Sequence, residues 1–101
     1  MKKINTETKI FKDFVKEIKK EKNFIVYLDN EINITKTMVN SISEGIKLIQ
    51  EFEEEYKKIL PYSHGWIEVK NKEYPVKMKQ EIFENLSKEE REIAIYFNDN
   101  L

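Results

Sequence analysis

Residues 38–60 read MVNSISEGIKLIQEFEEEYKKIL, and this stretch carries the clearest periodic pattern in the 101-residue chain. Its apolar residues recur every three or four positions over roughly six turns, the spacing of one helix face. These residues are Met38, Ile42, Ile46, Ile49, Phe52, Tyr56 and Ile59. We predict a helix from about residue 38 to Leu60 that forms the main support of the core. The residues expected to be buried are Ile42, Ile46, Ile49 and Phe52.

The ends of this helix have candidate signals of their own. Ser41 and Glu44 match a capping box, in which the side chain of each residue accepts a hydrogen bond from the backbone N–H of the other. Thr35 or Thr37 is an alternative cap. Pro61 restricts the residue before it and predicts the end of the helix.

Upstream of the long helix, the pattern predicts a first helix over about residues 7–21. Thr6 or Thr8 is its candidate N-cap. Its outer face carries alternating lysine and acidic residues, the pattern of a solvated helix surface. The apolar residues that follow helical spacing are Ile10, Phe11, Phe14, Val15 and Ile18.

A hairpin is predicted between the two helices. Residues 24–28 form an apolar strand, Asp29 and Asn30 form a two-residue turn, and residues 31–35 form the partner strand. The first strand is apolar on both faces and should be central, whereas its partner suits an edge. Ile25 and Tyr27 then share a face with Ile34 and Ile32.

Downstream of Pro61, residues 66–78 alternate and predict a second hairpin with its turn at residues 71–72. Its core side would hold Ile67, Val69, Tyr74 and Val76, while Trp66 and Lys77 would lie opposite each other on the other side. Residues 73–78 contain Pro75, which cannot donate a ladder hydrogen bond and so suits an edge strand. Short helices follow, the last one opened by a capping box at residues 87–90.

These elements predict one α+β domain over residues 1–101. The order is helix, hairpin, long helix, hairpin and short helices, with a four-stranded antiparallel sheet packed against the helices. Residues 31–35 and 73–78 are the predicted edges, and residues 24–28 and 66–70 are the predicted central strands. The 40% hydrophobic and 37% charged composition fits a small globular domain with a charged surface.

Composition also excludes several function classes. The chain has no cysteine, so disulfides, thiolate nucleophiles and zinc–thiolate sites are excluded. No apolar run approaches the length of a membrane span, and early charges interrupt any signal-peptide core. We therefore expect a cytoplasmic protein without a membrane partner. Arg91 is the only arginine, which removes most bidentate phosphate recognition.

The most distinctive local segment is PYSHGW, residues 61–66, which holds the only histidine and the only tryptophan. No nucleophile elbow, phosphate loop or second histidine frames it. His64 and Glu68 would lie about 13 Å apart along a strand, too far to ligate one metal. We expect no catalytic residue, no metal and no cofactor.

The same segment is the predicted partner-binding surface. Its members are Tyr62, His64 and Trp66, with Lys77 opposite, because aromatic side chains commonly anchor protein interfaces. A competing interpretation holds for the tryptophan: it would pack beneath a terminal helix together with Phe24, Val26 and Leu28. The tyrosine has no such core role in the pattern.

Three functional hypotheses remain. The first is a small non-enzymatic protein that binds and regulates or inhibits another protein. Its size and lack of catalytic motifs are typical of phage or mobile-element accessory proteins, including those of the anti-CRISPR and anti-defence type. The second is nucleic-acid binding through residues 1–22, which carry eight lysines against four acids, although the whole chain has a net charge of −1. The third is a structural homodimer built on the long helix.

Overall fold

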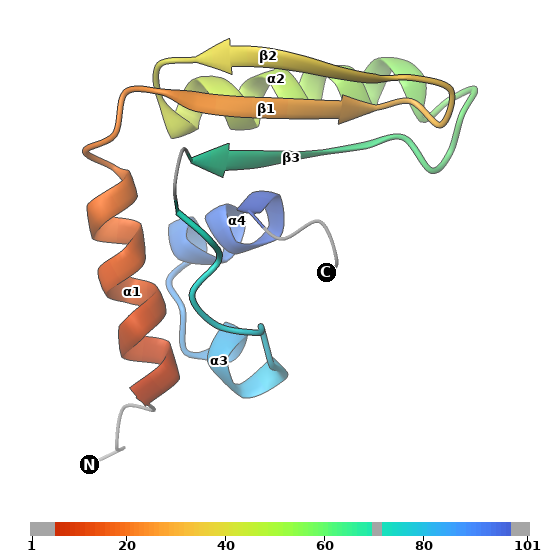
Figure 1. Cartoon of the computed structure of the whole chain (residues 1–101). Helices are drawn as coiled ribbons and strands as arrows, with labels where there is room; N and C mark the ends of the chain where they lie inside the picture. Colours follow the sequence, from red (N-terminus) through yellow and green to blue (C-terminus); the bar gives the residue numbers. More distant parts are fainter. Residues whose placement is uncertain (1–5, 70–71, 98–101) are drawn as a thin grey trace.

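The computed structural model describes residues 6–69 and 72–97 (Figure 1). Within these residues the fold is α+β, with four helices and a three-stranded antiparallel sheet. In chain order the elements are α1 (Thr6–Ile18), β1 (Phe24–Asp29), β2 (Ile34–Val39), α2 (Ile42–Tyr56), β3 (His64–Val69), α3 (Gln80–Glu84) and α4 (Lys88–Phe97). None of the helices in this described part is long and apolar enough to cross a membrane.

The sheet has the order β2-β1-β3, and both strand pairs are antiparallel. The central place of β1 confirms the expectation drawn from its two apolar faces. The predicted fourth strand at residues 73–78 is wrong, because Lys72 makes only an isolated bridge to Val69 and the chain then runs irregularly to α3. Pro75 cannot donate to a ladder. Residues 70–71, the predicted turn, lie outside the described residues.

Tyr74 shows what replaces the fourth strand. Its ring packs against the rings of Phe11 and Phe14 in α1, with centroid separations of 5.4 and 6.3 Å. The expected core residues Ile67 and Val69 are buried, but Tyr74 reaches the core from an irregular segment. Packing against α1 thus takes the place of strand pairing.

The first hairpin has a longer loop than predicted. The side-chain oxygen of Asn30 accepts hydrogen bonds from the backbone N–H groups of Ile32 and Asn33, and Glu31 has a φ of 72°. These contacts stabilise a loop over residues 30–33, so β2 begins at Ile34. The register moves by four residues, with Phe24 opposite Val39. Because this shift is even, Ile34 keeps the expected face.

The later start of β2 also shortens the long helix. Met38 lies in β2 with 63% of its surface exposed, and α2 begins only at Ile42. Ser41 is the N-cap and accepts from the Glu44 N–H at 3.2 Å, so the threonine caps are wrong. The helix ends at Tyr56, before the predicted end at Leu60. The first helix is likewise shorter than predicted and ends at Ile18.

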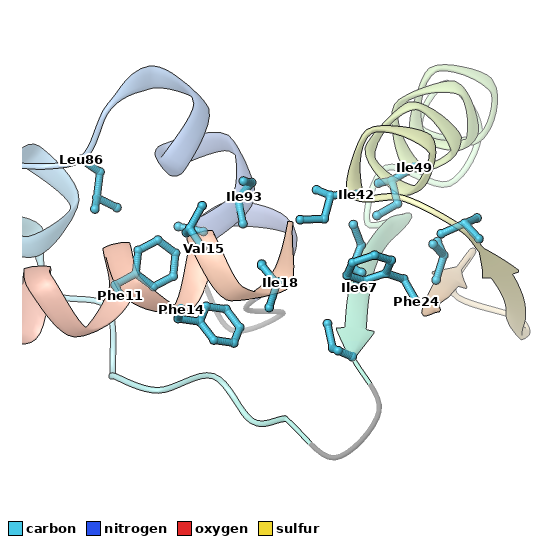
Figure 2. Packing of buried hydrophobic residues seen from close by; sticks show 14 of the residues in the cluster. Phe11, Phe14, Val15, Ile18, Phe24, Ile42, Ile49, Ile67, Leu86 and Ile93 are labelled. Carbon is cyan, nitrogen blue, oxygen red and sulfur yellow. The ribbon is translucent and has the colours of Figure 1, made fainter. Parts of the chain in front are cut away.

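The core lies on one face of the sheet and extends to α1 and α4 (Figure 2). Ile42 and Ile49 of α2 are buried as expected, while Ile46 and Phe52 are only partly buried against the same core. Ser87 and Glu90 form the predicted capping box of α4, with backbone-to-side-chain distances of 2.8 and 3.2 Å. The sheet residues of this core are Phe24, Val26, Leu28, Val39, Ile67 and Val69.

Gly65 belongs to β3 and not to a turn. Its φ is not positive, so the requirement for glycine is space. A Cβ at this position would lie 2.9 Å from Ile49 Cγ1 and 2.9 Å from the backbone oxygen of Tyr27. The missing side chain lets α2 approach the sheet closely, which fixes the covered face.

Candidate functional site

The opposite face of the sheet has no helix over it among the described residues. Figure 1 shows α2 behind β1 and β2 and no helix in front of the three strands. Cross-strand pairing places Tyr27 between Lys36 and Trp66, and Ile25 between Met38 and Glu68. We call this surface the open face. Its residues are Ile25, Tyr27, Asp29, Ile34, Lys36, Met38, His64, Trp66 and Glu68.

Four side chains cross the open face as a continuous layer, which we call the aromatic strip: Lys36, Tyr27, Trp66 and His64. Tyr27 and Trp66 stack with ring centroids 5.1 Å apart and an angle of 7° between planes. His64 stacks on the tryptophan at 5.4 Å and 23°. The ammonium of Lys36 lies 5.5 Å from the Tyr27 ring centroid, a cation–π distance. The four side chains are therefore ordered by contact with one another, and their ring faces are packed within the strip.

Glu68 acts on the Tyr27 hydroxyl from the neighbouring row of the open face. A hydrogen bond to this carboxylate, partial burial and the nearby negative charge together raise the pKa of Tyr27 above its ordinary value of 10.0. The hydroxyl thus donates a hydrogen bond to Glu68 at the edge of the strip.

Tyr62 lies beyond the end of the sheet, in the loop before β3. Its side chain is 78% exposed, and its backbone N–H donates to a carboxylate oxygen of Glu31 at 3.0 Å. The Tyr62 carbonyl in turn lies 3.0 Å from His64 Nδ1. These bonds join the loop before β3 to the loop between β1 and β2. The exposed side chains of Ile32 and Ile34 come from that hairpin.

The structure brings some of the predicted site residues together and leaves Lys77 apart from them. His64 and Trp66 are brought together in the strip, and Tyr62 is tied to it through the backbone. Lys77 is not opposite Trp66, because the strand that would have placed it there does not form. Packing of Trp66 with Phe24, Val26 and Leu28 is also wrong, since those three side chains lie on the covered face.

Two residues of the strip, Tyr27 and Lys36, were not predicted as site residues from the sequence. Tyr27 alternates with Val26 and Leu28, so its place on the second face of a central strand was the available signal. Lys36 became a neighbour of Tyr27 only through the four-residue register change. The loop contacts that set that register are not evident from periodicity.

The electrostatics of the open face are mixed. Lys36 is its one lysine or arginine, whereas Asp29 and Glu68 are acids. No group of three or more histidine or acidic side chains in the described residues is arranged to hold a metal ion. Apolar contact, the outward edges of the rings and a few polar groups are what this surface offers a ligand.

Comparisons of the chain with known protein families, curated proteins and solved structures found no match. The geometry and chemistry of the open face are therefore the basis on which a function is proposed.

Proposed function

We propose that this chain is a non-enzymatic protein-binding module that regulates or inhibits its partner through the open face and Tyr62. The observation that carries the proposal is the stacked aromatic strip on a sheet face with no helix over it in the described structure. Such rings bury a large area with few rotatable bonds, so little entropy is lost on binding. Tyrosine and tryptophan are common anchors of protein interfaces.

The surroundings of the strip also fit a protein partner. Ile34 and Met38 are 58% and 63% exposed and flank the strip on β2. Acidic and basic groups lie around this apolar centre, as in interfaces that have an apolar core and a polar rim. The charged groups then supply orientation, and the rings supply contact area.

Nucleic-acid binding is less well supported. The open face has one basic residue against two acids, so it does not attract phosphates. In the lysine-rich N-terminal region, Lys12 pairs with Glu90 at 3.5 Å and Lys19 pairs with Glu89 at 2.8 Å. These lysines hold α1 and α4 together. A homodimer through α2 is also less well supported, because the buried stripe of α2 packs on the sheet.

The role expected from size and composition is a specific form of this proposal. An accessory protein of the anti-defence type would cover a functional surface of a cytoplasmic defence protein without performing chemistry on it. The open face supplies a surface for that task, and the cytoplasmic location stays a prediction.

The test compares two open-face variants with one matched control. Trp66→Ala and the double variant Tyr62→Ala/His64→Ala remove aromatic contacts, whereas Ile95→Ala removes a 49% exposed apolar side chain from α4. Affinity chromatography on native lysate with each immobilised variant identifies bound proteins, and calorimetry then measures affinity for the purified partner. We expect the partner to bind the wild type and the control equally.

For each open-face variant we expect at least a tenfold loss of affinity, about 1.4 kcal/mol. Circular dichroism checks that the variants remain folded. Equal affinity of a folded Trp66→Ala variant and the wild type would remove the open face from consideration. Binding to DNA or RNA that weakens steeply with salt would favour the nucleic-acid hypothesis.

A further inference from the structure

The outer edge of β2 lacks the usual features that prevent strand pairing. Within the described residues, β2 pairs with β1 alone, residue for residue, without a bulge. Its six residues, ITKTMV, contain no proline and no glycine. Sheet edges of this kind are templates for another strand unless proline, a bulge, a charge or a covering element blocks them.

The two edges of the sheet differ in this respect. Along β3, Val69 bridges to Lys72, and the groove beside it is lined in part by Tyr74 and Phe97 from other elements. Along β2, the one charged side chain is Lys36, and its ammonium is drawn over the Tyr27 ring on the open face. Lys36 therefore does not block the backbone edge.

The covered side of β2 is also incompletely packed. Thr35 is exposed and Thr37 is half-buried, although both lie on the same face of the sheet as the buried residues of β1. A groove of about 320 Å³ lies between β2 and α2. Its lining includes Thr37, Val39 and Leu48, with the charged residues Glu44, Lys47 and Glu51.

We propose that a second copy of this chain pairs with the outer edge of β2, antiparallel and about a twofold axis at Thr37. The dimer would join two three-stranded sheets into one continuous sheet. A twofold axis perpendicular to the sheet keeps the open faces of both copies on the same side. This inference is independent of the proposed partner binding, because it uses the backbone edge and leaves the open face accessible.

Side-chain pairing selects the register of this dimer. Residues directly opposite each other point to the same face of the sheet, and side chains alternate between the faces along a strand. The twofold axis must therefore pass through one residue of β2 and not between two residues. An axis at Lys36 would place two like charges opposite each other, which is unfavourable. An axis at Thr35 would pair the edge with residues 31–33, where Glu31 has a φ of 72° and the chain is not extended.

An axis at Thr37 avoids both problems. It pairs residues 35–39 of each copy, all within β2, and places Thr37 opposite its own copy and Lys36 opposite Met38. On the covered side, Lys47 lies in the same groove as Glu44 and Glu51. The edge is thus self-complementary in register.

The cysteine-free chain permits a direct test. Residues opposite each other in an antiparallel pair have Cα atoms about 4.5–5.5 Å apart, which suits a disulfide. We expect Thr37→Cys to form a covalent dimer in air or with mild oxidant. The matched control is Thr35→Cys, whose two copies would lie about 13 Å apart along the strands and should stay uncrosslinked.

Sedimentation of the unmodified chain complements the crosslinking. We expect its mass to rise with concentration from the 12.2 kDa monomer towards twice that value. Trp66→Ala should leave this rise unchanged, which separates dimerisation from partner binding. A mass that stays monomeric at protein concentrations up to about 1 mM would overturn the proposal, because it limits the free energy of dimerisation to about 4 kcal/mol. Crosslinking of Thr35→Cys in preference to Thr37→Cys would equally overturn it.

Discussion

Ile67 and Trp66 are neighbours in β3, yet they belong to opposite faces of the sheet. Ile67 is 1% exposed beneath α2, whereas Trp66 is half-buried on the open face against Tyr27 and His64. The same three strands therefore serve two purposes through alternate residues. The covered face should determine stability, and the open face should determine recognition.

The largest expected effect is on the covered face. Ile49 is fully buried in α2, and Ile49→Ala should cost roughly 2–4 kcal/mol of unfolding free energy through lost burial and a residual cavity. Urea unfolding measures this value. An unchanged denaturation midpoint would show that α2 does not hold the sheet through this residue.

A somewhat smaller effect is expected at the closest approach of α2 to β3. Gly65→Ala should cost about 1–3 kcal/mol, because its new Cβ would meet a backbone oxygen that cannot easily move. Gly45→Ala is the control, since its Cβ would meet only side-chain atoms at 3.1 Å and beyond. Equal losses in the two variants would contradict this explanation.

The open face should respond less in stability. Trp66→Ala should cost roughly 0.5–1.5 kcal/mol, the scale of an aromatic pair, although tryptophan is the largest side chain in the sheet. Ile67→Ala, one position away, should lose about 2–4 kcal/mol. The two variants are compared by urea unfolding under one set of conditions. A greater loss for Trp66→Ala would reverse the assignment of the faces.

The smallest effect concerns the titration of Tyr27. Its pKa is raised in the folded state, so the stabilisation from its neutral form is present below the ordinary value of 10.0 and is lost as the pH rises through the raised pKa. Glu68→Gln removes the negative charge and should lower the pKa of Tyr27. Ultraviolet absorbance of tyrosinate, with Tyr27→Phe to identify the signal, measures this change. An unchanged pKa of Tyr27 in the Glu68→Gln variant would show that Glu68 does not act on this hydroxyl.

The sequence predicted those parts of the fold that depend on periodicity. The α+β class, the central place of β1 and the buried residues of α1 and α2 follow from patterns that a helix face or a strand face enforces. The N-cap at Ser41 and the capping box at Ser87 were predictable because each depends on short, local hydrogen bonds. At the first of them Glu44 accepts from the Asn40 N–H instead of the Ser41 N–H.

The errors occurred where local contacts or tertiary packing overrode the pattern. Hydrogen bonds to the Asn30 side chain lengthened the hairpin loop and moved Met38 from the predicted helix into β2. Tyr74 packed on α1 and no fourth strand formed, which removed Lys77 from the site. His64 and Trp66 were identifiable as the only histidine and the only tryptophan, and Tyr62 as their neighbour in residues 61–66. Tyr27 and Lys36 required the strand order and register.

The contacts between α1 and α4 have a consequence for synthesis of the chain. Phe14 and Phe97 pack edge to face with centroids 5.8 Å apart, so a helix made early depends on one made late. The stretch from β1 to β3 is continuous and can form first, whereas closing α1 onto α4 spans most of the described chain. Until α4 leaves the ribosome, the apolar stripe of α1 lacks its partner. A nascent chain that ends after β3 would therefore present α1 as a site for chaperones.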